Sequence, residues 1–302
     1  MKTLAALIVL MMIVFPKSGI SQNTNPVSSG NKEMKNPTGQ YFGLKPPTST
    51  PEVFAPEIPF FKTRKVNSTL YAPDGKYFYV MANDSLFYMK SEDGHWTMPE
   101  IAIDIAGKIS GYSISPDGKF LLFTSNGDIF SCKRKENKWS SPEKLPEQVS
   151  SEKYECGNSM AMDHSIFYAS QRDGTKGNCD IFYSKFKDGR YETPINLDKL
   201  NTNGSECGVY ISPKDEFIIF TGFDNRAEGF GSTDLYISFP SKDGSWSTPQ
   251  NMGPLINTID SEWPLSISPD GKYLFFSRYH ISSKTSEVYW VDSKIINELK
   301  NK

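Results

Sequence analysis

The sequence predicts an all-β fold built from five copies of one short sheet unit. Three observations predict it: a turn that recurs along the chain, a strand-like run after each copy, and one strand-like segment displaced to the front of the first copy. The 20 Phe and 15 Tyr among the 302 residues fall mostly in such runs. These aromatic residues favour the half-buried surface of a pleated sheet.

The recurring turn is a Pro-Asp-Gly sequence or a degenerate form of it. Complete copies occupy residues 73–75, 116–118 and 269–271, and degenerate copies occupy 162–164 and 213–215. Pro presets φ, Asp accepts hydrogen bonds from nearby backbone amides, and Gly tolerates a positive φ. We therefore expect each copy to close a tight hairpin that leads into an apolar strand.

Two further strand-like elements follow each turn. The second element of each repeat lies at residues 85–88, 128–130, 180–183, 234–236 and 287–290. The third, a Trp or Tyr followed three residues later by Pro, lies at residues 96–99, 139–142, 191–194 and 246–249. The last repeat lacks this third element, and the matching segment, residues 51–56, stands before the first repeat.

This organisation predicts a single β-propeller of five four-stranded blades, with a sixth, more divergent blade left open. A four-stranded unit cannot bury both faces alone, so such units stack radially. Residues 51–56 would complete the last blade and close the ring, which removes exposed sheet edges. Residues 295–300 predict a short C-terminal helix.

The repeats resemble those of the TolB-like, WD-repeat-like propeller family, which carry Ser-Pro-Asp-Gly-Lys followed by a Leu-Phe-Phe-type strand, as at residues 115–119 and 268–272. The resemblance covers about residues 50–296. It implies an exported or periplasmic platform that binds proteins, peptides or glycans, and it implies no single function. The copies at 162–164 and 213–215 depart from the motif but keep an acidic residue in the turn.

The N-terminus has the features of a cleavable signal peptide. An apolar run at residues 4–15 follows a lysine, and it is shorter than the ~20 residues of a membrane helix. We therefore expect residues 1–21 to be a signal peptide, 22–50 a flexible linker rich in small polar residues, and 51–302 the propeller domain. The mature protein would be periplasmic or secreted, without a membrane span.

The net charge and the cysteine content limit the classes of partner and metal site that we expect. Lys and Arg total 33 against 35 Asp and Glu, so the chain lacks the basic excess of a nucleic-acid-binding protein. We expect a monomer without a cofactor or metal, and a protein, peptide or glycan partner. The four cysteines match no zinc motif. Cys156 and Cys207 occupy the same position in their repeats, so a disulfide between neighbouring repeats is one alternative. Buried free thiols are the other alternative. The sequence does not decide the disulfide state of its four cysteines: Cys132, Cys156, Cys179 and Cys207.

The candidate ligand-binding site lies around the predicted channel mouth. Three glutamates stand seven residues before the turn Pro or its substitute, where the first two repeats have Val66 and Ile109. Together with charged loop residues and one Trp, they form the predicted ligand-binding set: Glu155, Glu206, Glu262, Arg172, Arg226, Arg278 and Trp263. These residues could form a polar pocket, with or without a divalent cation on oxygen ligands.

An alternative hypothesis assigns a structural role to the same three carboxylates. Each Glu would accept backbone amides at the start of its strand, or pair with a nearby Arg. For the aspartates that open the second element, Asp128, Asp180 and Asp234, we expect a structural role, since a short carboxylate there can bond the amides of the preceding loop.

The sequence favours a non-enzymatic binding module. The competing function is a carbohydrate-active hydrolase that uses the channel-mouth carboxylates as acid and base. The turns at residues 91–96 and 241–246 resemble sialidase Asp-boxes but lack one residue of that spacing, and the chain has only six Arg. It also has no Gly-x-Ser-x-Gly elbow, and we expect its three His to lie in turns or loops. No catalytic residue is predicted.

Overall fold

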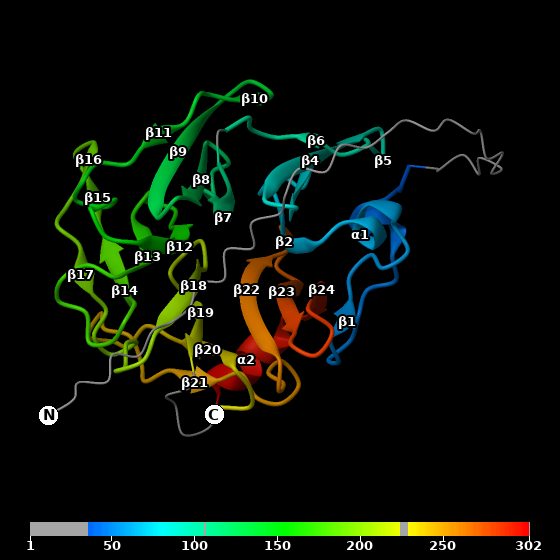
Figure 1. Cartoon of the computed structure of the whole chain (residues 1–302). Helices are drawn as coiled ribbons and strands as arrows, with labels where there is room; N and C mark the ends of the chain where they lie inside the picture. The colour runs from blue at the N-terminus through cyan, green and yellow to red at the C-terminus, as the bar shows by residue number, and fades with distance from the viewer. Residues whose placement is uncertain (1–35, 106, 224–228, 302) are drawn as a thin grey trace, which may run out of the picture. The chain divides into compact units, whose positions relative to one another are not determined.

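The computed structural model describes residues 36–105, 107–223 and 229–301, and it is almost entirely β (Figure 1). The predicted signal peptide and residues 22–35 lie outside these ranges. Within them, no helix combines the length and the apolar character needed to cross a bilayer.

The strands form five antiparallel units of one design, each with three adjacent long strands and short outer ones. The first unit contains β2 (Val66–Tyr71), β3 (Tyr77–Ala82), β4 (Ser85–Glu92), β5 (His95–Trp96) and β6 (Glu100–Ile101). The second contains β7 (Ile109–Ile114), β8 (Phe120–Ser125), β9 (Asp128–Lys135), β10 (Lys138–Trp139) and β11 (Glu143–Lys144). The third contains β12 (Glu155–Met160), β13 (Ile166–Ser170), β14 (Asp180–Ser184) and β17 (Ile195–Asn196), with a hairpin of β15 (Phe186–Lys187) and β16 (Arg190–Tyr191).

The last two units share one sheet. The fourth contains β18 (Glu206–Ile211), β19 (Ile218–Phe223), β20 (Thr233–Ser238) and β21 (Gln250–Asn251). The fifth contains β22 (Ser261–Ile267), β23 (Tyr273–His280), β24 (Thr285–Asp292) and β1 (Glu52–Val53). A single parallel pair, Thr233 with Ser261, joins the two units.

The five recurring turns close hairpins as predicted. Gly75, Gly118 and Gly271 adopt φ values of 67°, 72° and 75°, and each amide bonds the carbonyl three residues before it at 2.8 Å. In the two degenerate copies, His164 and Asp215 take the same left-handed conformation, with φ 67° and 57°. The turn geometry is therefore kept where the glycine is lost, at the cost of backbone strain.

Asp215→Gly should stabilise the protein by about 0.5–1 kcal/mol, because glycine adopts this φ without a Cβ clash. Partial desolvation and the nearby charge of Asp163 raise the pKa of Asp215 to about 6, but the residue is exposed, so solvent screening reduces the effect of this shift on stability. A carboxyl whose pKa is raised on folding costs stability once it ionises, so the penalty grows as pH rises from about 4 to 6. The gain from glycine should therefore be larger at pH 7.5 than at pH 4, as measured by urea unfolding.

Asp215→Asn is the matched control for the turn, since it removes the charge and keeps the strained backbone. It should stabilise the protein at pH 7.5 and have little effect at pH 4. Equal effects of the two variants at both pH values would exclude backbone strain as a cost at this position.

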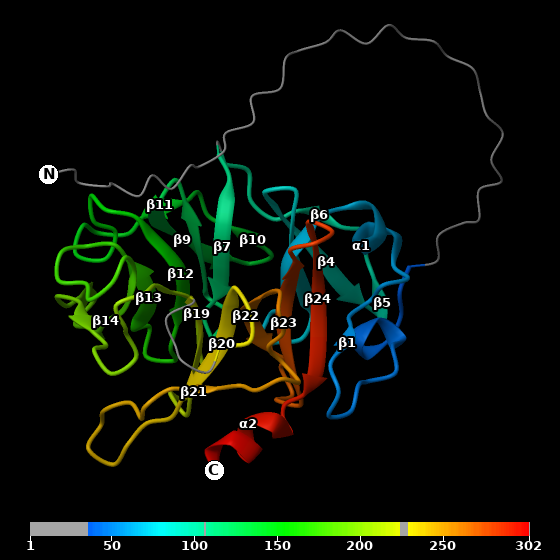
Figure 2. The same ribbon diagram turned by 60° about the horizontal axis from the view of Figure 1, so that its bottom comes forward.

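The displaced N-terminal strand pairs with the last strand of the chain, as predicted. β1 runs antiparallel to β24, with Glu52 opposite Trp290 and Val53 opposite Tyr289 (Figure 2). The amide of Phe54 continues the ladder with a 2.7 Å hydrogen bond to the carbonyl of Val288. β2 of the first unit also lies against β22, β23 and β24 (Figure 1).

The segment expected to be a linker, residues 22–50, contains two aromatic residues that pack against the folded units. Tyr41 and Phe42 are buried in the same apolar cluster as Phe54 and Trp290. The Tyr41 hydroxyl donates to Asp270 at 2.7 Å, and burial is the main cause that raises the pKa of Tyr41. Two aromatic side chains therefore anchor a stretch whose composition is otherwise that of a linker.

Buried apolar clusters connect each unit to the next. Within the described residues, five clusters each combine side chains of neighbouring units, and one of them joins the fifth unit to the first through residues such as Phe275 and Phe78. The predicted C-terminal helix is present as α2 (Lys294–Lys300), which buries three apolar side chains against the fourth and fifth units. The short helices α1 (Pro59–Thr63) and η1 (Gln40–Gly43) were not predicted.

Candidate ligand-binding cavity

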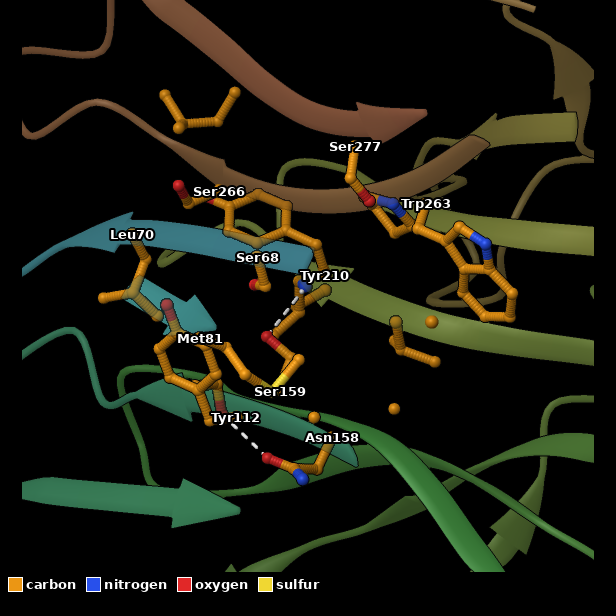
Figure 3. Close-up of a pocket in the computed structure, with 18 of the residues that line it drawn as sticks. Ser68, Leu70, Met81, Tyr112, Asn158, Ser159, Tyr210, Trp263, Ser266 and Ser277 are labelled. Carbon is orange, nitrogen blue, oxygen red and sulfur yellow. Dashed lines mark hydrogen bonds between the residues drawn. The ribbon is translucent and has the colours of Figure 1, made fainter. Parts of the chain in front are cut away.

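A cavity of about 1210 Å³ lies between the first strands of the five units: β2, β7, β12, β18 and β22 (Figure 3). One end is bordered by the recurring turns, through Pro73, Pro116, Pro213 and Pro269. α2 reaches the lining near this end, through Ile296 and Asn297. The repeated design of the units thus brings one equivalent strand from each of them to a single cavity.

Each of the five lining strands has one register shift against its partner strand, although the shifts do not all fall at the same repeat position. The pairing register shifts within residues 66–68, 109–111, 156–159, 207–210 and 264–266. A bulge bends a strand and increases its twist. In β22 the bulge contains Pro264, which has no amide to donate and is tolerated at such irregular positions.

The lining is rich in hydroxyl, amide and aromatic groups and poor in charge. Small polar groups come from Ser68, Ser113, Asn158, Ser159, Ser266 and Ser277. Aromatic groups come from Tyr71, Tyr112, Tyr154, Tyr210, Trp263 and Tyr279. Among the described lining residues the ionisable acids and bases other than Tyr and Cys are Lys65, Asp84, Lys108 and Glu216, and Lys108 pairs with Asp84 at 2.8 Å.

Some of these polar groups connect neighbouring units. Ser113 donates to the Asn158 carbonyl oxygen at 3.0 Å, which links the second unit to the third (Figure 3). The hydroxyl of Ser159 accepts from the Ile211 amide at 3.1 Å, which links the third unit to the fourth. The cavity wall is therefore held in place by the same kinds of groups that could contact a ligand.

The three predicted glutamates are fully buried, and their carboxylates bond within their own units. A Ser or Thr four residues earlier donates its hydroxyl to each of them: Ser151 to Glu155 at 2.5 Å, Thr202 to Glu206 at 2.6 Å and Thr258 to Glu262 at 2.7 Å. The backbone amides of Thr202 and Thr258 also donate, at 3.1 and 3.3 Å. This is the geometry expected if the carboxylates have a structural role, in which each one accepts hydrogen bonds at the start of its strand.

The predicted arginines complete this arrangement. Arg278 donates to Glu262 at 2.8 Å and to the Ile256 carbonyl at 2.8 Å. Arg172 reaches Glu155 at 3.3 Å and the Val149 carbonyl at 2.7 Å. Burial raises the pKa values of Glu155 and Glu262, while these cations and hydroxyls oppose the rise. Arg226 lies outside the described residues.

Trp263 is the predicted site residue that lines the cavity, whereas the glutamates and the two described arginines are not among its lining residues. Its indole contacts Phe223 edge to face, with ring centroids 5.8 Å apart. Sequence reasoning missed Tyr112, Asn158 and Ser159, because it placed the site on loops. The signal that could have identified them is the run of small polar residues within the first strand of a repeat.

Two of the three aspartates that open the second elements, Asp180 and Asp234, bond the amides of the preceding loop as expected, whereas Asp128 bonds side chains that follow it in the sequence. Asp180 accepts from the amides of Lys176 and Gly177 at 2.7 and 3.2 Å. Asp234 bonds its preceding loop in the same way. Asp128 accepts from Ser150 at 3.0 Å.

All four cysteines are free thiols in the structure. Cys132 is buried in the core, and burial raises its pKa to about 11. Cys156 and Cys207 lie side by side at the cavity wall, with their sulfur atoms 3.4 Å apart.

Comparisons with known proteins show the fold. No family model matches the sequence, and no curated protein matches it. A solved structure described as TolB from Agrobacterium tumefaciens is 18% identical, with 76% of this chain and 77% of that chain covered and a TM-score of 0.50. Hydrazine synthase from Kuenenia stuttgartiensis is 11% identical, with 85% and 81% covered and a TM-score of 0.46. The tricorn protease is 10% identical, with 76% of this chain and 21% of that chain covered and a TM-score of 0.47.

The first of these similarities identifies the class of protein as an all-β chain with a TolB-like propeller fold. This similarity shows the fold and assigns no role.

Proposed function

We propose that this protein is a non-enzymatic binding module whose ligand occupies the cavity between the five units. The observation that carries the proposal is the lining of that cavity, in which hydroxyl, amide and aromatic groups from equivalent strands face one space of about 1210 Å³. Binding pockets combine apolar and aromatic surface with a few placed polar groups, and they commonly measure about 300–1,000 Å³. This cavity has that character and is somewhat larger.

In this proposal the five units are the blades of a closed propeller. The pairing of β1 with β24 and the apolar cluster between the fifth and first units support ring closure. Every strand within the described ranges belongs to one of the five units, which supports five blades over six.

The lining favours a neutral glycan as the ligand. Sugars present hydroxyl groups that exchange hydrogen bonds with Ser and Asn side chains, and apolar ring faces that pack on Tyr and Trp. A strongly charged ligand would meet few counter-charges here, because Lys108 and Asp84 neutralise one another. A peptide or protein partner would need to form hydrogen bonds with the same neutral hydroxyl and amide groups.

We assign the buried glutamates and arginines to support of the cavity wall. A glycosidase needs two carboxyl groups that face each other across a solvent-lined pocket. Glu155, Glu206 and Glu262 instead bond within their own units, so the hydrolase alternative gains no support from their geometry. The proposed export to the periplasm or cell exterior depends on the apolar segment at residues 4–15.

A glycan array tests the proposal with the chain from residue 22 onward. We expect retention of neutral oligosaccharides, and a loss of at least about tenfold in affinity for Trp263→Ala, because an aromatic contact of about 1.4 kcal/mol or more is removed. Trp246→Ala is the matched control, since Trp246 is also half-buried but is not among the residues that line the cavity. Glu262→Gln should retain binding.

Unchanged affinity in Trp263→Ala, with the fold confirmed by its melting curve, would exclude this cavity as the binding site. A native pull-down from the envelope fraction that recovers a protein, with no oligosaccharide retained on the array, would replace the glycan assignment by an assembly scaffold.

A further inference from the structure

Three cysteines from separate parts of the sequence converge at the cavity wall. Cys156 lies on β12, Cys207 lies on β18, and Cys179 precedes β14 in the third unit. Their sulfur atoms all lie within 4.8 Å of one another. Cys156 and Cys207 line the cavity, and Cys179 is buried behind them.

Glycines make this convergence possible. Gly157 and Gly208 follow the two cavity cysteines and adopt φ values of 51° and 49°. A Cβ on Gly157 would lie 2.5 Å from the backbone nitrogen of Gly208, so no other residue fits without moving the strands apart. The Cys-Gly pair repeated in β12 and β18 therefore fixes both the close approach of the strands and the separation of the thiols.

The backbone also holds the third cysteine in place. The Cys179 carbonyl accepts from the Glu206 amide at 2.8 Å, and the Asn178 amide donates to the Gly204 carbonyl at 2.8 Å. Cys179 pairs with Ser205 in a parallel bridge. The loop that carries Cys179 is thus attached directly to the start of β18, next to Cys207.

The thiols share one hydrogen-bonded network. Donation from the Cys156 and Cys179 thiols holds the pKa of Cys207 well below its usual range, and the same sharing raises the pKa of Cys156 well above it. Glu206 and Asp180 are the sequence neighbours of Cys207 and Cys179, and their carboxylates add further negative charge nearby.

We propose that Cys156, Cys179 and Cys207 form a three-thiolate site for one Zn²⁺ ion, whose fourth coordination position faces the cavity. Thiolates prefer soft cations such as Zn²⁺. Tetrahedral Zn²⁺ with Zn–S bonds of about 2.3 Å places its sulfur ligands about 3.8 Å apart. The observed sulfur separations, from 3.4 Å between Cys156 and Cys207 to at most 4.8 Å, bracket that value.

Charge favours a divalent ion. Three thiolates with Zn²⁺ leave a net charge of about −1, whereas a monovalent ion would leave about −2 beside two carboxylates. Binding forms three Zn–S bonds and releases to water the protons that the three thiols carry, with no change of oxidation state. The inference stands on the positions of the sulfur atoms and does not depend on the proposed glycan ligand.

Metal retention by the full chain, purified without chelator, tests the site. We expect one Zn²⁺ per chain after dialysis, and one equivalent of Cd²⁺ to give the ultraviolet absorption of a thiolate complex. Cys156→Ser and Cys207→Ser should each weaken Zn²⁺ binding by more than about 100-fold, because a ligand is lost. Zn²⁺ affinity should also fall as pH falls, since protons compete for the sulfur atoms.

Cys132→Ala is the control, because it removes a buried thiol outside the cluster and should leave Zn²⁺ retention unchanged. Cys179→Ser should also abolish retention. If that variant does not fold, the two variants at half-buried positions, Cys156→Ser and Cys207→Ser, decide the question, with melting curves of their metal-free forms as the check of folding.

Three results would overturn the proposal. The first is a chain that retains no Zn²⁺ and gives no Cd²⁺ absorption. The second is a mass 2 Da below that of the free-thiol chain, with Cys156 and Cys207 in one linked peptide, which would establish a disulfide in place of a metal site. The third is preferential retention of Cu⁺ in competition with Zn²⁺, which would exclude the divalent assignment.

Discussion

Phe54→Ala should destabilise the protein by about 3–5 kcal/mol, the usual cost of removing a fully buried Phe side chain. The ring of Phe54 is only 1% exposed and immediately follows β1. It contacts the rings of Phe78 in the first unit and of Phe275 and Trp290 in the fifth unit. Its loss would leave a cavity where the two ends of the chain meet.

Urea unfolding of the two forms measures this effect. Phe60→Ala is the matched control, because it makes the same chemical change at a half-buried position in α1 and should cost less than about 1.5 kcal/mol. A loss of less than about 1 kcal/mol for Phe54→Ala would mean that the junction of the first and last units contributes little to stability.

Arg278→Met should destabilise the protein by about 3–5 kcal/mol, because it removes the cation from a buried carboxylate. Glu262 is fully buried, and Arg278 is its charged partner at 2.8 Å. The Arg278 guanidinium also covers the ring of Tyr289, 4.4 Å from its centroid. Methionine keeps much of that apolar contact, so the decrease in the free energy of unfolding reflects mainly the missing positive charge of Arg278.

The effect should depend on pH with a definite sign. Burial already raises the pKa of Glu262, and removal of Arg278 raises it further. A carboxyl whose folded pKa lies above its unfolded value loses stability as pH rises, because the ionised form is the costly one. Arg278→Met should therefore be less stable at pH 8 than at pH 5, relative to the native chain.

The double variant Glu262→Gln with Arg278→Met separates charge from packing. It should recover much of the stability lost at pH 8, since no buried charge is then left without a partner. Equal losses at both pH values, with no recovery in the double variant, would assign the effect to the contact with Tyr289.

Sequence reasoning predicted the strands and turns because their causes are local. Pro-Asp-Gly sets its own backbone geometry, and the degenerate turns at His164 and Asp215 keep that geometry through the strands on either side. The anchoring of Tyr41 and Phe42 was missed, because it depends on aromatic partners such as Trp290 that are distant in sequence.

The candidate site was predicted in part, for a reason visible at Glu262 and Trp263. Successive side chains of a strand point to opposite faces. Trp263 lines the cavity and the neighbouring Glu262 does not, so their adjacency in sequence could not place both at one site. The repeat pattern could not predict the cysteine cluster either, because Cys179 lies on a loop and not at an equivalent strand position.

The pairing of β1 with β24 has a consequence for biosynthesis. β1 is synthesised before β2 to β23, and its partner β24 is synthesised after them. The earlier units can form as they emerge, but Phe54 stays without its neighbours Phe275 and Trp290 until β23 and β24 have been synthesised. Nascent chains therefore expose an apolar aromatic surface until the fifth unit has been synthesised, which makes that interval the stage at which a chaperone would bind.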